Sequence, residues 1–178
     1  MSTESVLDGI CAYYGGAYDD NRRLYVTSPV PGVGVVGRGW PKRDNHADFF
    51  NGMPPGTRTG SHITAFIPHQ VEYRESFGGA TGGMKRVLYW VQLCCYLRSR
   101  SEHAEDAQDD MYALRDALDA YTRADRTLGG AVFQAGEAIQ GMGAAAAISF
   151  EYGQPETRAE LTKGFLLMKF GAVEFVFA

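Results

Sequence analysis

The residues best suited to acid and base chemistry are two aspartates in the middle of the chain. Asp106 and Asp110 are four residues apart, which places them on one face if this stretch is helical. Paired carboxylates can act as general acid and general base. The stretch opens with many acids, namely Glu102, Glu105, Asp106, Asp109 and Asp110, and acids favour the positive end of a helix dipole. We therefore interpret them as a solvated helix face and predict no catalytic residue.

A glycine-rich segment at 32–37, GVGVVG, matches the letters of the dinucleotide-binding fingerprint. That fingerprint needs a strand before it and a helix that begins at the third glycine, so that the helix terminus holds a pyrophosphate. Pro29 and Pro31 precede the segment and Pro41 follows it closely, so neither element is expected. We predict no bound cofactor.

The spacing of histidines and cysteines argues against a metal site. His62 and His69 are seven residues apart on an expected strand and therefore point to opposite faces, while His46 lies in an expected loop. Cys94 and Cys95 are adjacent and lack the two-residue spacer of zinc and redox pairs. We predict no bound metal and expect buried, reduced thiols.

Length and composition favour one globular domain over residues 1–178, with 45% hydrophobic and 21% charged residues. The net charge of −4 argues against specific DNA binding, which needs clustered Lys and Arg to neutralise phosphates. The sequence has no signal peptide and no apolar run long enough to span a bilayer. We therefore expect a protein that is made in the cytoplasm and binds no membrane.

The strongest structural signal is the stretch from Met84 to Arg98, in which apolar residues recur at the two-residue period of a strand. One face carries Val87, Tyr89, Val91, Leu93, Cys95 and Leu97, and the other carries Leu88, Trp90, Cys94 and Tyr96. A strand that is apolar on both faces must be covered on both sides. We expect helices on one side and a partner subunit on the other, and predict a subunit interface at Leu88, Trp90, Tyr96 and Arg98.

A second strand is expected before this one, at 61–74, with a break or bulge at Pro68. The connection between the two strands is rich in glycine and too long for a two-residue turn. We predict a long antiparallel hairpin whose tip holds Phe77, Gly78, Gly79, Gly82 and Gly83.

Two helices are expected, one from Ser2 or Thr3 to Gly15 and one from about Glu102 to Ala124, the latter with a capping box of Ser99 and Glu102. Further strands are expected at 24–26, 145–152 and 165–177, the last interrupted at Gly171, while 133–139 is ambiguous. The fold class is α+β, a mixed or antiparallel sheet with a long hairpin and two or more helices on one face.

Residues 27–60 contain five prolines, Pro29, Pro31, Pro41, Pro54 and Pro55, among many glycines. This composition predicts an irregular loop or arm inserted in the domain. Its aromatic residues Trp40, Phe49 and Phe50 are candidates for contact with a neighbouring ring.

Several of these segments together resemble the tail terminator proteins of long-tailed, siphovirus-type bacteriophages. They are the first helix, the glycine-tipped hairpin, the strand VLYWV at 87–91, the helix start AEDAQ at 104–108 and the turn ADRTLGG at 124–130, with Asp125, Leu128, Gly129 and Gly130. The resemblance covers about residues 61–178.

The resemblance implies a structural virion protein with no enzymatic activity, located at the junction of head and tail. It implies a homo-oligomer, a hexameric ring that caps the head-proximal end of the tail tube and ends tail polymerisation. The expected partners are the tail tube protein and the head-tail connector or head-completion protein, and DNA would pass through the lumen without specific binding. The net-negative charge agrees with this, because it repels phosphates.

Two alternatives remain open. A head-tail joining, neck or tail-completion ring protein would have the same fold class. A more remote alternative is a small cytoplasmic module that binds a ligand or peptide in a clamp lined by Trp40, Phe49 and Phe50.

Overall fold

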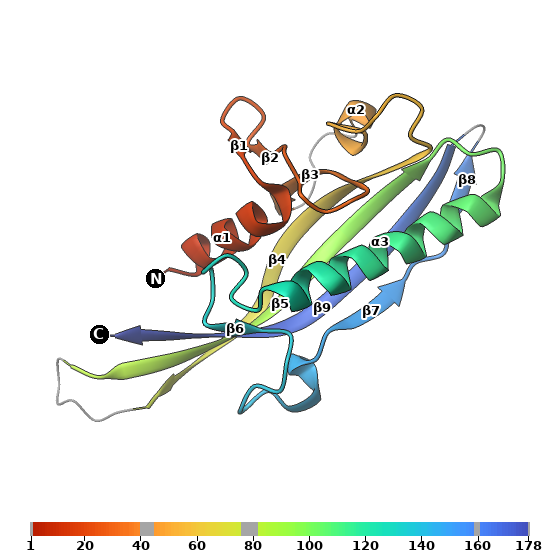
Figure 1. Ribbon diagram of the computed structural model, residues 1–178. Coiled ribbons are helices and arrows are strands. Elements are labelled where there is room, and N and C mark those ends of the chain that lie inside the picture. Colours follow the sequence, from red (N-terminus) through yellow and green to blue (C-terminus); the bar gives the residue numbers. More distant parts are fainter. Residues whose placement is uncertain (1, 40–44, 76–81, 159–160, 178) are drawn as a thin grey trace.

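The chain folds into an α+β structure, as predicted, in which helices pack on a mixed sheet (Figure 1). The computed structural model describes residues 2–39, 45–75, 82–158 and 161–177. In chain order the elements are α1 (Thr3–Gly15), β1 (Tyr18–Asp19), β2 (Leu24–Tyr25), β3 (Val33–Arg38), α2 (His46–Phe49), β4 (Thr59–Arg74), β5 (Met84–Ser99), α3 (Ala104–Ala124), β6 (Gln134–Ala135), the 3₁₀ helix η1 (Gly143–Ala146), β7 (Ser149–Tyr152), β8 (Glu156–Arg158) and β9 (Leu161–Phe177).

Three long antiparallel strands, β4, β5 and β9, form the centre of the sheet, with β5 in the middle. The short strand β3 pairs with β4 in parallel, and β1 and β2 continue the sheet beyond β3. On the other side β6, β7 and β8 each pair with β9. One sheet therefore joins all the strands of the described residues.

The predicted hairpin is confirmed by the pairing of β4 with β5, and the ladder shifts register between Phe66 and His69, around Pro68. Proline cannot donate a ladder hydrogen bond, which explains the irregularity at this position. Gly82 and Gly83 lead into β5. The other predicted tip residues, Phe77, Gly78 and Gly79, lie outside the described residues.

The expected interruption of the last strand at Gly171 is wrong, because β9 runs unbroken through this residue. An added Cβ at Gly171 would lie 2.7 Å from the Cα of Ala146, in η1. The glycine therefore lets another segment approach the backbone of the strand. The expected strand at 145–152 is correspondingly shorter, since its first residues belong to η1 and β7 begins at Ser149.

Residues 33–38 were expected to be irregular, but they form β3, whose first five residues are buried. The glycines permit close packing there instead of breaking the structure. A Cβ on Gly34 would lie 2.2 Å from the carbonyl oxygen of Asp48, and one on Gly60 would lie 2.1 Å from that of Phe49. The backbone of α2 thus rests directly on the sheet, which a larger side chain would prevent.

The two predicted long helices cover one face of the sheet. Helix α1 begins at the N-cap Ser2, which forms a capping box with Ser5, and buries Val6 and Ile10. Its Tyr14 hydroxyl lies 2.6 Å from the hydroxyl of Thr122 in α3. Both helices pack on the residues predicted to share the first face of β5, from Val87 to Leu97, and this confirms the alternation read from the sequence.

The predicted capping box of α3 is wrong. Its N-cap is His103, with no hydrogen bond from a capping side chain. Ser101 supplies the polar contacts instead, since its hydroxyl accepts the backbone N–H of His103 and donates to Asp106. Within the described ranges, no helix has the length and apolar character needed to cross a lipid bilayer.

Candidate functional site

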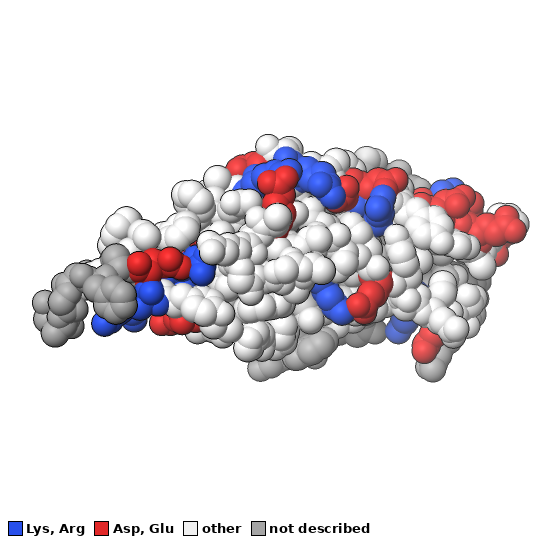
Figure 2. Space-filling model, turned by 90° about the horizontal axis from the view of Figure 1, so that it is seen from below, with Lys and Arg blue, Asp and Glu red and all other residues white. Residues whose placement is uncertain are grey.

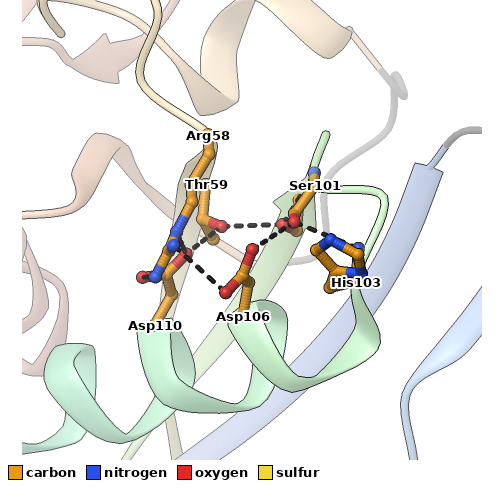
Figure 3. Close-up of polar contacts among 7 residues, drawn as sticks. Arg58, Thr59, Ser101, His103, Asp106 and Asp110 are labelled. Atoms are coloured by element: carbon orange, nitrogen blue, oxygen red, sulfur yellow. Dashed lines mark hydrogen bonds and ion pairs between the residues drawn. The ribbon is translucent and has the colours of Figure 1, made fainter.

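A polar cluster joins the start of α3 to the ends of β4 and β5 (Figure 3). The Arg58 guanidinium binds the Asp110 carboxylate through two hydrogen bonds of 2.8 Å and lies 3.2 Å from Asp106. The Thr59 hydroxyl lies 2.5 Å from Asp110 and 2.9 Å from the hydroxyl of Ser99. Asp106 and Asp110 thus share a face of the helix, as expected, but they bind side chains of the sheet and are not a simple solvated surface.

The geometry of this cluster suits anchoring rather than catalysis. Ser101 donates to Asp106, but it touches His103 only at the backbone amide, so no imidazole is placed to take the serine proton. Both carboxylates are paired with the Arg58 guanidinium, which occupies the oxygens that a substrate would need to reach. Arg58 and Thr59 were not singled out from the sequence, because they are some fifty residues from the acids that they bind.

Asp110→Asn is expected to lower the free energy of unfolding by about 1 kcal/mol at neutral pH, since the partly exposed Arg58 is screened by solvent. Burial acts to raise the pKa of the Asp110 carboxyl, but hydrogen bonds from Arg58 and Thr59 outweigh it and hold that pKa below its ordinary value of 3.8. A carboxyl with a depressed folded-state pKa stabilises the fold above its ordinary pKa. This stabilisation is lost as the pH falls through the lower, folded-state pKa.

Urea unfolding of the native and Asp110→Asn proteins, at neutral pH and again well below pH 3.8, measures this effect. The two proteins should differ at neutral pH and converge in acid. A difference that grows as the pH falls would contradict the assignment of Asp110 as a charged anchor.

A second cluster surrounds α2 at the same end of the sheet. The Arg98 guanidinium lies 4.2 Å from the centre of the Phe49 ring, and that of Arg100 lies 3.9 Å from the centre of the Phe50 ring. The His46 imidazole lies 3.2 Å from Arg98 and 2.9 Å from Arg100. Burial, and then the charge of Arg100, lower the pKa of His46. The neutral imidazole is therefore favoured between the two cations.

This cluster corrects the expectation of a free arm at 27–60. Phe49 is only 5% exposed and packs beneath Arg98, so it stabilises this chain and is not free to contact a neighbouring ring. Phe50 is partly buried and covered by Arg100. Neither ring lines an open clamp for a ligand. Trp40, the third aromatic residue of the predicted arm, lies outside the described residues.

The second face of β5 is covered only in part by this chain. At one end Leu88 is fully buried with Ile139, Met142 and Ala146, and at the other end Arg98 is 5% exposed beneath α2. Two of the four residues predicted at a subunit interface are thus covered by their own chain. Sequence alternation identified this face, but it gave no sign that the distant residues 139–146 fold over it.

Between these ends lies a strip of half-buried aromatic side chains, here called the open strip and defined by Phe66, Trp90, Tyr96 and Phe165. The Trp90 ring lies against the His69 ring in a tilted arrangement with a centroid distance of 4.6 Å, and the Tyr96 ring lies 5.3 Å from that of Phe165. Phe66 is 41% exposed. Of the four residues predicted at a subunit interface, Trp90 and Tyr96 are therefore the two that stay partly open. Phe66 and Phe165, which were not predicted there, lie on the same face.

Charged groups are sparse on one side of the molecule. Figure 2, which views the protein from below Figure 1, shows Lys, Arg, Asp and Glu gathered mainly along the borders of a broad uncharged area. A single group of opposite charges interrupts this area. Depletion of charge is typical of the centre of a protein interface.

The turn after α3, singled out in the resemblance, has a structural role. The Asp125 carboxylate accepts the backbone N–H groups of Thr127 and Gly129, both at 2.9 Å. The hydrogen bond from the Thr127 hydroxyl, and then these two backbone bonds, lower the pKa of Asp125. Leu128, Gly129 and Gly130 all adopt positive φ angles, and Leu128 is 1% exposed. The aspartate thus holds a left-handed turn that buries a leucine in the core.

No family model matches the chain, and no curated protein matches its sequence. The tail terminator resemblance therefore stays a prediction.

Proposed function

We propose that this protein is a structural component of a bacteriophage virion that assembles into a hexameric ring at the head-proximal end of the tail tube. The ring ends polymerisation of the tube and offers a surface for the head connector or head-completion protein. DNA passes through its lumen without specific binding. Tail terminators of long-tailed phages are the proteins that the sequence resembles, and the proposal takes its biological setting from them.

The observation that carries the proposal is the open strip. Its side chains Trp90, Tyr96 and Phe165 are half-buried on a sheet face that the described residues cover closely at both ends and only in part between them. Aromatic residues such as these are enriched at protein interfaces. The open strip is therefore proposed to meet another subunit, in the same ring or in the last ring of the tube.

Two further features support a structural role over an enzymatic one. The carboxylates best placed for chemistry, Asp106 and Asp110, are bound to Arg58 and anchor a helix. The net charge of −4 also suits a lumen that must not grip DNA.

Assembly of tail tube protein in the presence and absence of this protein tests the proposed function. Tubes grown in its presence should stop elongating, and negative-stain images should show added density at one end only. Tubes that elongate at the same rate and stay bare at both ends would contradict it. Binding to isolated head connectors but not to tubes would favour the head-tail joining alternative.

A further inference from the structure

The dipeptide Asn-Gly occurs at one place in the sequence, Asn51 and Gly52, just after α2. Of the other two asparagines, Asn21 precedes an arginine and Asn45 a histidine. A glycine that follows asparagine has no side chain to hinder its backbone nitrogen from reaching the asparagine amide carbon. Asn-Gly is therefore the pair at which an asparagine side chain most readily closes into a succinimide ring.

The backbone nitrogen of Gly52 is available for this reaction. Gly52 is exposed and adopts a φ of +69°, in the left-handed region that favours glycine. The N–H groups of Phe50, Asn51 and Met53 each donate to a carbonyl oxygen three residues earlier, but that of Gly52 donates to no other residue of the described chain. The nitrogen therefore has no hydrogen bond to break before it attacks.

The Asn51 side chain links the turn after α2 to three other positions. Its Nδ2 atom donates to the carbonyl oxygens of Val26, at 2.7 Å, and of Gly34, at 3.4 Å. Its Oδ1 atom accepts a hydrogen bond of 3.1 Å from the Arg22 guanidinium. A cation at this oxygen stabilises the negative charge that develops there when the amide carbon is attacked.

We infer that Asn51 is a site of spontaneous deamidation, and that loss of its amide weakens the attachment of α2 to β3. The Gly52 nitrogen loses its proton and bonds to Cγ of Asn51, the Cγ–Nδ2 bond breaks, and the amide leaves with a proton as ammonia. Water then opens the succinimide at either ring carbonyl, which gives aspartate or isoaspartate. The reaction consumes only water and does not depend on the proposed function.

Either product removes the hydrogen-bond donor that the amide supplies. A carboxylate only accepts hydrogen bonds, so the carbonyl oxygens of Val26 and Gly34 would face a negative charge in place of an N–H group. Arg22 would offset little of this cost, because its side chain is 50% exposed and already lies 3.5 Å from Asp19. Isoaspartate also adds a carbon to the backbone of the turn that follows α2.

Peptide mapping by mass spectrometry, on the full-length protein stored at neutral and at mildly alkaline pH, tests the site. The peptide with Asn51 should gain the mass difference between an amide and a carboxyl group. The gain should be faster at the higher pH, because the Gly52 nitrogen must lose its proton. Isoaspartyl methyltransferase should label the same peptide, while Asn21 and Asn45 should keep their amides over the time in which half of Asn51 reacts.

Asn51→Asp reproduces one product directly. Its Tm should be lower by roughly 4–8 °C, because carbonyl oxygens of the fold lose their donor, and hydrogen exchange of the amides in α2 should be faster. Asn21→Asp makes the same change at an exposed position and should alter neither property. Stored native protein, in which the reaction follows folding, gives the same measurements if Asn51→Asp does not fold.

Loss of the amide at Asn51 no faster than at Asn21 or Asn45 would overturn the deamidation site. An unchanged Tm and unchanged hydrogen exchange in α2, in both Asn51→Asp and the deamidated native protein, would overturn the effect on α2.

Discussion

Trp90→Asp is expected to abolish assembly while leaving the isolated subunit folded. Trp90 is half-buried in the open strip, where it lies against the His69 ring. A carboxylate there would be desolvated without a partner when another subunit covers the strip. Loss of a central aromatic residue from an interface costs about 2–4 kcal/mol, equivalent to roughly 30- to 1000-fold in affinity. Light scattering and tube capping measure the loss.

The matched control for this variant is Ala120→Asp, which adds the same charge on the exposed side of α3. It should assemble like the native protein. If Trp90→Asp unfolds the isolated chain, Trp90 belongs to the core of the subunit. If it stays folded and assembles normally, the open strip is not an interface.

Gly34→Ala is expected to cause a large loss of stability at the α2 end of the sheet. The new Cβ would lie 2.2 Å from the carbonyl oxygen of Asp48 and 2.5 Å from that of Phe49, so the backbone of α2 must move away. Such overpacking costs about 3 kcal/mol, which corresponds to a decrease in Tm of roughly 6–12 °C for a chain of this length. Scanning calorimetry measures the shift.

Gly164→Ala is the control, because its Cβ would meet Leu97 at an ordinary distance of 3.6 Å. Its Tm should stay within about 3 °C of the native value, since surface-like substitutions without a clash change stability little. Equal effects of the two substitutions would show that close packing of α2 on β3 is not what Gly34 provides.

The sequence predicted the elements whose signal is local. The period of two over 84–98 identified β5 and the residues on its core face. The sequence also predicted α3, in which Met111, Leu114 and Leu118 are buried. Proline at position 68 marked the bulge in β4. In each of these segments the local pattern and the tertiary environment favour the same structure.

Local sequence patterns gave the wrong secondary structure at glycines that contact segments distant in the chain. Prolines and glycines around residues 33–38 indicate irregular chain, but these residues form a buried strand. Because Gly34 has no Cβ, the backbone of α2 can pack directly on this strand. Gly171 likewise makes room for η1 without breaking β9. A single sequence does not distinguish a glycine that interrupts a strand from one that lets another segment pack against the strand's backbone. Both roles depend only on the absence of a Cβ atom.

The candidate sites depend on contacts between residues far apart in the chain, and these were the least predictable. The anchor of Arg58 on Asp110 and the cover of Leu88 by residues 139–146 join segments about fifty residues apart. The open strip was predicted in part, because Trp90 and Tyr96 follow from alternation on β5. Its other members, Phe66 and Phe165, become neighbours only through the register of three strands.

The native mass of the purified protein, measured by light scattering alone and after incubation with tail tubes, tests the ring most directly. A hexameric ring has a mass six times that of the 178-residue chain, and this mass is expected either for the free protein or for the protein recovered with capped tubes. A particle of one subunit that stays unchanged when tubes are added would contradict it.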